Sequence, residues 1–172
     1  PEISKRSASV PASPIRGLVP YAEKAMELGK KVFFLNIGQP DVPTPAGIFE
    51  AVRNFHEPVL AYGGSHGNPD LVRALVRVYR EELGVHLEPE NVLVTAGGSE
   101  ALWFTIMVLC DPGDELVVPE PFYANYAAVF AGAGVRIVPV TTRTEDGYHL
   151  QRENAREAIE SRISPRTRAL LL

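Results

Sequence analysis

The stretch Leu116–Val140, LVVPEPFYANYAAVFAGAGVRIVPV, decides the fold of this chain. It contains an apolar strand at Leu116–Val118, a helix at Tyr123–Ala131, two glycines that end the helix, and a second strand at Val135–Val140. Two strands joined through a helix are typical of a crossover connection between parallel neighbours in one sheet. The stretch therefore predicts a parallel sheet.

The same alternation continues on both sides of this stretch. Upstream, a strand at Val92–Ala96 leads into a helix at Ser99–Cys110, and downstream a helix at Gln151–Ile163 leads into a strand at Arg168–Leu172. The strands are continuous apolar runs, as expected where helices cover both faces of a sheet. We predict an α/β fold with three layers, α/β/α, around a mainly parallel sheet.

The N-terminal part has a different character. Residues 1–13 are small and polar and predict an arm, not a packed element. A helix is expected over Ser13–Gly29, with serine as its cap, proline at its first position and glycine at its end. A short strand is expected at Val32–Ile37, and a further helix begins at Asn68-Pro69 and ends at Gly84.

The composition excludes several classes of function. The 172 residues are 45% hydrophobic and 22% charged, which is ordinary for a folded protein, and the net charge is −4. A negative chain is a poor general binder of nucleic acid, because phosphates attract basic surfaces. The longest apolar run, Ala101–Cys110, is shorter than the roughly 20 residues that span a membrane, and no signal core is present. We expect a cytoplasmic protein without nucleic-acid or membrane partners.

No metal site is predicted. None of the four histidines has another histidine, cysteine or carboxylate at a convincing ligand spacing; they are His56, His66, His86 and His149. Cys110 is the only cysteine, at the end of an apolar helix, and we expect a buried, inert thiol there.

A glycine turn marks the first candidate binding site. Gly97, Gly98 and Ser99 lie between a predicted strand and a predicted helix, where parallel sheets bind ligands. The first amides of a helix have no partners within the helix, and its dipole favours an anion such as phosphate. Glycine allows the anion to approach the backbone. The alternative is a simple tight turn in which Ser99 caps the helix.

Three aromatic residues form a second candidate site at the end of the next strand. Phe122, Tyr123 and Tyr126 follow the strand that begins near Leu116. A ring there can stack on a planar ligand. The alternative, for Phe122 and Tyr126, is that these side chains belong to the helix core.

Short motifs follow one another along nearly the whole chain in the order of a known family. They are SPIR at Ser13–Arg16, LNIGQPD at Leu35–Asp41, Tyr62 with Gly67 and DLVRAL at Asp70–Leu75, TAGGSEAL at Thr95–Leu102, DPGDE at Asp111–Glu115, and PFYANY at Pro121–Tyr126. With these motifs the chain resembles the N-terminal half of the class I/II aminotransferases, the aspartate-aminotransferase-like enzymes of fold type I that use pyridoxal 5′-phosphate.

The resemblance implies a role for each matching residue. Gly97–Ser99 match the turn that holds the cofactor phosphate, and Tyr123 matches the ring that stacks on the pyridine. Tyr62 matches a tyrosine whose hydroxyl reaches the cofactor phosphate of the neighbouring subunit, which implies a homodimer. Gly38 matches a glycine that lies against the substrate amino acid. The alternatives are an ordinary loop tyrosine at Tyr62 and a plain turn glycine at Gly38.

The family's Schiff-base lysine has no counterpart here. It lies in a later S-x-x-K segment, whereas the lysines of this chain are all early; they are Lys5, Lys24, Lys30 and Lys31. The chain also stops inside a predicted strand, so we expect a fragment without catalytic residues that is inactive alone. Residues 1–45 would be an arm, helix and strand of the small domain or interface. Residues 46–172 would be the N-terminal part of the cofactor-binding large domain.

The resemblance implies transfer of an amino group from an amino acid to a 2-oxo acid through pyridoxal phosphate. Other enzymes of the same fold type share this half of the chain, so a β-lyase and a cyclopropane-carboxylate-forming synthase stay open. A non-catalytic regulator that binds pyridoxal phosphate, and a plain phosphate-binding α/β module, are further alternatives.

Overall fold

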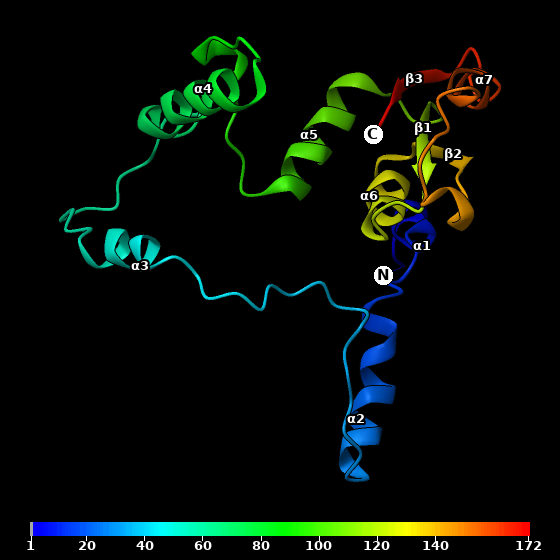
Figure 1. Cartoon of the computed structure of the whole chain (residues 1–172), viewed down its shortest axis with the longest axis horizontal. Coiled ribbons are helices and arrows are strands. Elements are labelled where there is room, and N and C mark those ends of the chain that lie inside the picture. The colour runs from blue at the N-terminus through cyan, green and yellow to red at the C-terminus, as the bar shows by residue number, and fades with distance from the viewer. Residues whose placement is uncertain (1) are drawn as a thin grey trace. The chain divides into compact units, whose positions relative to one another are not determined.

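The computed structural model describes residues 2–172, so Pro1, the first residue of the predicted arm, lies outside the described residues. Figure 1 shows the course of the chain. In chain order the elements are α1 Lys5–Ser9, η1 Arg16–Leu18, α2 Val19–Glu27, α3 Ala46–Arg53, α4 Pro69–Leu83, η2 Pro89–Asn91, α5 Gly98–Leu109, β1 Glu115–Glu120, α6 Asn125–Ala133, β2 Arg136–Thr141, η3 Thr144–Asp146, α7 Ala155–Glu160 and β3 Thr167–Leu170.

The three strands form one parallel sheet in the order β2-β1-β3. The central strand β1 pairs with β2 from Glu115 opposite Arg136 to Glu120 opposite Thr141. Helix α6 connects β1 to β2, and α7 lies in the connection from β2 to β3. The α/β class and the parallel sheet predicted from the sequence are confirmed. In this sheet β2 and β3 are the two edge strands.

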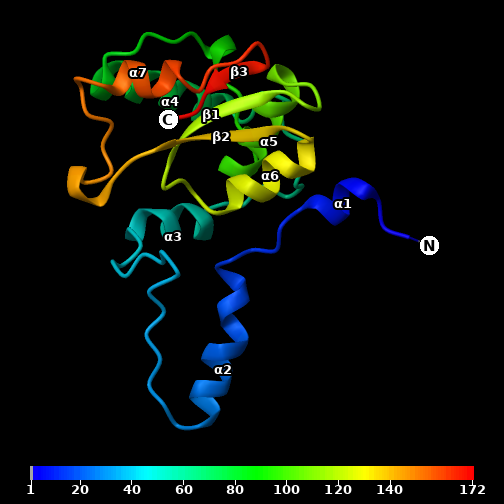
Figure 2. The ribbon, with the colours of Figure 1, turned by 90° about the vertical axis from the view of Figure 1, so that its right-hand side faces the viewer.

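The core lies where α5 and α6 cover one face of the sheet. Ile106 of α5 and Phe130 of α6 pack with Leu116 and Val118 of β1, and Figure 2 shows α6 alongside β1 and β2. Val117 points to the other face and is only 1% exposed. Both faces of β1 are therefore covered, as its unbroken apolar sequence predicts.

The chain forms two compact units. The first contains the residues up to 37 together with 102–172, and the second contains residues 38–101. The first unit holds the sheet with α1, α2, α6 and α7, and the second holds α3 and α4. The domain boundary expected between residues 45 and 46 concerns the intact protein and stays a prediction.

The N-terminal arm is more ordered than expected. Residues Lys5–Ser9 form α1, which is capped by Ser4 and contacts α6. The Val10 side chain that follows lies beside Gly132 of α6. The arm thus carries a short helix, but residues 2–12 are all exposed and α1 buries none of its residues, so the prediction of an arm outside the core is confirmed.

The two predicted N-terminal helices are present. The Ser13 hydroxyl accepts a hydrogen bond from the Arg16 amide at 3.4 Å, and η1 and α2 follow. The Asn68 side chain accepts from the Asp70 amide at 2.8 Å and caps α4, which ends at Gly84 in the left-handed conformation. Helix α3 lies in a segment for which no element was predicted.

Two predicted strands are wrong. Neither Val32–Ile37 nor Val92–Ala96 pairs with a strand among the described residues. In the first segment, local bonds from the Leu35 amide to Phe33 and from the Ile37 amide to Phe34 curl the backbone. In the second, the backbone makes one long-range bond, from the Val94 amide to the His66 carbonyl at 3.0 Å. The helix predicted at Gln151–Ile163 is shortened to α7.

Candidate functional site

The glycine turn at the start of α5 is held closed by its own backbone. Gly97 has a φ of +101°, a conformation that glycine adopts without a steric penalty. Its carbonyl oxygen accepts hydrogen bonds from the Thr95 hydroxyl at 2.9 Å and from the amides of Glu100 at 3.1 Å and Ala101 at 3.2 Å. The turn is therefore a fixed structure and not a loose connection.

The amides at the tip of this turn are available to a ligand. The Ala96 amide donates to the Glu100 carboxylate at 2.6 Å. By contrast, the amides of Gly98 and Ser99 and the Ser99 hydroxyl donate to no acceptor within residues 2–172, and all three groups are exposed. Ser99 is the second residue of α5, so it does not occupy the cap position that the simple-turn alternative requires.

Gly98, unlike Gly97, is not required to be glycine by its backbone conformation. Its φ lies outside the left-handed region, and a Cβ atom built on it meets no atom within 4 Å. Neither backbone strain nor packing therefore requires glycine at this position. Open space directly over two unpaired amides is the geometry that an oxyanion needs.

Gly38 and Tyr62 belong to the same unit as the glycine turn. A Cβ atom at Gly38 also meets nothing within 4 Å. Tyr62 is fully exposed in the irregular segment between α3 and α4. Within the described part of the chain, no polar contact joins either residue to the turn. Their roles stay predictions.

Tyr123 lines a hollow at the carboxyl ends of β1 and β3, within the first unit. The hollow has a volume of about 490 Å³. Its walls come from the segment after β1, the segment after β3, and the loop after η3; they include Phe122, Tyr123, Tyr126, Tyr148, His149 and Leu171. Sequence reasoning missed Tyr148 and His149, because they follow η3 at a distance from every motif.

The aromatic residues of this hollow divide into two groups. Phe122 and Tyr126 stack at a centroid distance of 6.2 Å, Tyr126 and Phe130 stack at 5.9 Å, and all three pack in the core around α6. The helix-core alternative thus holds for Phe122 and Tyr126. Tyr123 is 54% exposed and meets Tyr126 edge to face at 5.7 Å, and Tyr148, which lines the same hollow, is 52% exposed, so these two rings are open to a ligand.

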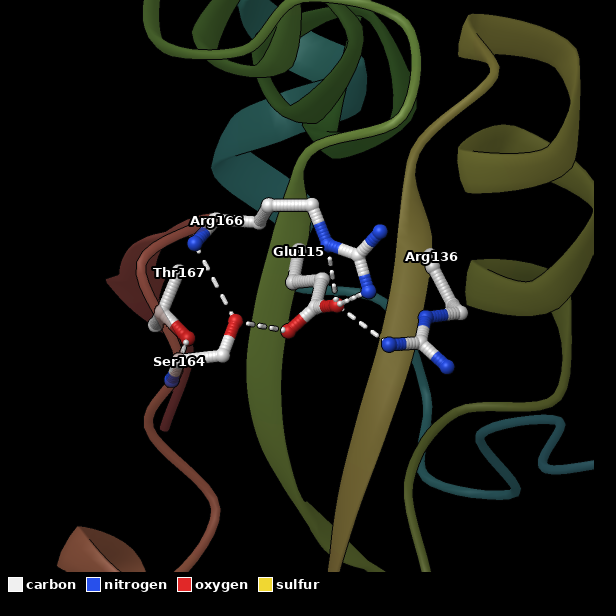
Figure 3. A network of polar contacts seen from close by, with 5 residues as sticks. All are labelled: Glu115, Arg136, Ser164, Arg166 and Thr167. Atoms are coloured by element: carbon white, nitrogen blue, oxygen red, sulfur yellow. Dashed lines mark hydrogen bonds and ion pairs between the residues drawn. The ribbon is translucent and has the colours of Figure 1, made fainter.

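The amino ends of the strands carry a network of charges. Glu115, the first residue of β1, is 2% exposed and accepts hydrogen bonds from Arg136, from Arg166 Nε at 3.0 Å and from Ser164 Oγ at 2.7 Å (Figure 3). The hydrogen bond from Arg136, followed by that from Ser164, lowers the pKa of Glu115. The network joins all three strands at the end opposite the hollow.

A second ion pair lies beside this network. Arg168 Nε donates to Asp114 Oδ2 at 2.7 Å, and this hydrogen bond holds the pKa of Asp114 below its usual range. Cys110 packs against the core, where burial and then the Asp114 charge raise the pKa of its thiol. A raised pKa agrees with the inert thiol that the sequence predicts.

Two classes of site find no support within the described residues. No group of three or more histidine, cysteine, aspartate or glutamate side chains in residues 2–172 is arranged to hold a metal ion. No helix in this range has both the length and the apolar content that crossing a membrane requires.

Known protein sequences share most of this chain. Residues 30–172 match the family described as aminotransferase class I and II. An arginine–pyruvate transaminase of Pseudomonas aeruginosa is 36% identical over 152 residues, which cover 86% of this chain and 37% of that protein. An aspartate/prephenate aminotransferase of Thermus thermophilus is 36% identical over 153 residues, or 87% of this chain and 39% of that protein.

Solved structures agree with the sequence matches. The aspartate aminotransferase of Rhizobium meliloti has a TM-score of 0.89 at 28% identity, over 99% of this chain and 42% of that one. An alanine aminotransferase of Pyrococcus furiosus has a TM-score of 0.85 at 34% identity, over 98% of this chain and 43% of that one. The chain thus spans about two fifths of the length of the relatives it matches.

Proposed function

The chain belongs to the class I and II aminotransferases, and on this basis we propose that the intact protein transfers the amino group of an amino acid to a 2-oxo acid with pyridoxal phosphate. The names of the relatives support amino-group transfer over the elimination and ring-forming reactions of other fold-type-I enzymes. Within this proposal, residues 46–172 are the first part of the cofactor-binding domain, and residues 1–45 contribute to the small domain or interface.

The observation that carries the proposal is the free donor set at the glycine turn. Gly98 and Ser99 offer two amides and a hydroxyl that donate to no other described residue, at the positive end of α5. These groups fit the phosphate of the cofactor, and the open space over Gly98 admits its oxygens. Glu100 does not consume these donors, since its carboxylate binds the Ala96 amide.

The ring of the cofactor is assigned to Tyr123 in the first unit. Its half-exposed ring lines a hollow at the carboxyl ends of the strands, where parallel sheets bind their ligands. When bound, pyridoxal phosphate supplies an aldehyde that takes up the amino group and a ring that withdraws electrons. The role of this chain is to hold the phosphate and to orient the ring.

Tyr62 and Gly38 complete the proposed set of contacts. Tyr62 is a large, fully exposed ring without a hydrogen-bond or ring partner in residues 2–172. We assign its hydroxyl to the cofactor phosphate of a second subunit in a homodimer. Gly38, where a side chain is neither excluded by packing nor disfavoured by its backbone, is assigned to the substrate amino acid.

The test uses the intact protein with its cofactor removed. Titration with pyridoxal phosphate should restore a visible absorption band, and addition of an amino acid should shift it. A panel of amino acids with pyruvate or 2-oxoglutarate is then assayed for the new amino acid and the new 2-oxo acid. Absence of cofactor binding contradicts the proposal. Release of ammonia without amination of the 2-oxo acid points instead to an eliminating enzyme.

A further inference from the structure

The inference begins at Asn125, the first residue of α6. Its side-chain amide donates a hydrogen bond to the Tyr123 hydroxyl at 2.7 Å. Asparagine at a helix start usually serves the helix by capping its free amides. Here the cap position belongs to Ala124, and no side chain caps the helix. The Asn125 side chain instead makes its hydrogen bond to Tyr123.

Two contacts together restrain the position and the plane of the Tyr123 ring. At its tip, Asn125 holds the hydroxyl. At its edge, Tyr126 meets it at an interplanar angle of 88° and a centroid distance of 5.7 Å. Tyr126 is in turn immobilised by its stacking on Phe130 in the core. A half-exposed tyrosine without such contacts samples several rotamers, and a ligand that stacks on it must then order the ring.

We propose that Asn125 is a positioning residue that presets the Tyr123 ring for a planar ligand in the hollow. The inference rests on the proposed function, in which that ligand is the pyridine ring of pyridoxal phosphate. Asn125 itself does not stack on the ligand, and it acts through the Tyr123 hydroxyl. An exposed hydrogen bond of this kind contributes little to folding, so its effect falls on ligand binding.

The experiment is a double-mutant cycle in the intact protein. Asn125→Ala, Tyr123→Phe and the double variant are freed of cofactor and titrated with pyridoxal phosphate. We expect N125A to weaken binding about fivefold when Tyr123 is present, as for side chains in direct contact. In the Y123F background, where the hydroxyl is gone, N125A should change nothing. Visible circular dichroism of the bound cofactor, which reports ring orientation, should fall in N125A and Y123F alike.

Each outcome is decisive. An equal loss of affinity in both backgrounds shows that Asn125 acts through α6 and overturns the inference, as does an N125A variant that binds like the wild type. Alanine is a better helix former than asparagine, and Asn125 is only half-buried, so N125A should fold. Asn154→Ala, at the start of α7 where the side chain also makes no cap, is the matched control and should bind normally. Failure of the wild type to bind pyridoxal phosphate overturns the proposed function, and this inference falls with it.

Discussion

Gly97 and Gly98 are neighbours in the same turn, but they are glycine for different reasons. Gly97 needs its backbone freedom, because its φ is +101° and its carbonyl closes the turn. Gly98 needs neither freedom nor packing space, and its missing side chain leaves two amides uncovered. A substitution at each position should therefore damage a different property of the protein.

We predict that Gly98→Val weakens pyridoxal phosphate binding by the intact protein about tenfold or more. The valine side chain would occupy the space over the amides and block hydrogen bonds to a charged group, each worth roughly 1.5–3 kcal/mol. The thermal unfolding midpoint should not fall, because the new side chain meets no protein atom. Cofactor retention on dialysis and a titration of the cofactor-free protein measure the effect.

Gly97→Val is the matched control for this prediction. It forces a branched residue into a left-handed conformation, so its main effect should be a lower unfolding midpoint. Unchanged cofactor retention in G98V would remove the glycine turn from the proposed phosphate site.

Single residues with local signals are the most predictable part of the candidate site. Gly97, Gly98 and Tyr123 lie in short motifs that follow apolar runs, so the sequence alone indicates where to look. The partners of Glu115 could not be foreseen, because Arg136 and Arg166 meet it only through the register of three strands. Tyr148 and His149 also reach the hollow only through the folded structure, because the loop after η3 brings them there.

At the scale of elements, helices were predicted better than strands. A helix such as α4 forms from local bonds, and its cap Asn68 and terminal Gly84 are readable in the sequence. A strand exists only where a second strand pairs with it. Val92–Ala96 has the apolar sequence of a strand, but it finds no such partner in residues 2–172.

Besides the hydrogen bond to His66, a close packing contact holds Val94 in the second unit, and a substitution can test it. A Cβ atom at Gly67 would lie 2.5 Å from Val94 Cβ, and Gly67 has a φ of +102°. We predict that Gly67→Ala lowers the free energy of unfolding by about 1–3 kcal/mol, the usual cost of forcing an extra group into a packed site. Urea unfolding of the intact protein measures the change.

The neighbouring Gly63 provides the control for that substitution. A Cβ atom there meets nothing within 4 Å, and its φ lies outside the left-handed region. Gly63→Ala should therefore leave stability unchanged or slightly raised. Equal effects of the two substitutions would show that the close contact between Gly67 and Val94 does not support the fold.

In the first unit, the two ends of the sheet have separate tasks. The carboxyl ends of β1 and β3 border the hollow with Tyr123. The amino ends hold Glu115 and its arginines, which join all three strands (Figure 3). Within the proposed function, stability and ligand binding should therefore respond to different substitutions.

We predict a specific dependence of stability on acid for the intact protein. The pKa of Glu115 in the folded state lies below its ordinary value of 4.5. Its charge therefore stabilises the fold above about that value, and the stabilisation is lost as pH falls through the lower, folded-state pKa. Glu115→Gln should lower the free energy of unfolding near neutral pH and should make it fall less steeply on acidification below about pH 5.

Unfolding by urea at a series of pH values measures this dependence. Glu145→Gln replaces an exposed carboxylate that forms no ion pair with any described residue and serves as the control. Parallel pH profiles of E115Q and the wild type would show that the network does not contribute to acid sensitivity.

The proposed dimer can be tested by mixing two defective variants. Tyr62→Ala should impair the neighbouring subunit's site, whereas Gly98→Val should impair its own. In a hybrid dimer both defects then fall in one site and the other site is intact, so activity at limiting cofactor should rise above that of either variant after the two are unfolded and refolded together. The control is wild-type protein that is unfolded and refolded in the same way. If it recovers its activity while the mixture of variants gains none, Tyr62 lies outside the partner's site.

The edge strand β3 has a consequence for handling the chain in the laboratory. Its outer side carries backbone donors and acceptors that pair with no strand among residues 2–172, and Leu170 on it is partly exposed. Such an edge is prone to aggregation, because an extended segment of another chain can pair with it as a new strand. Expressed by itself, this stretch of 172 residues should aggregate through β3, and a lysine introduced there would be the first change to try for solubility.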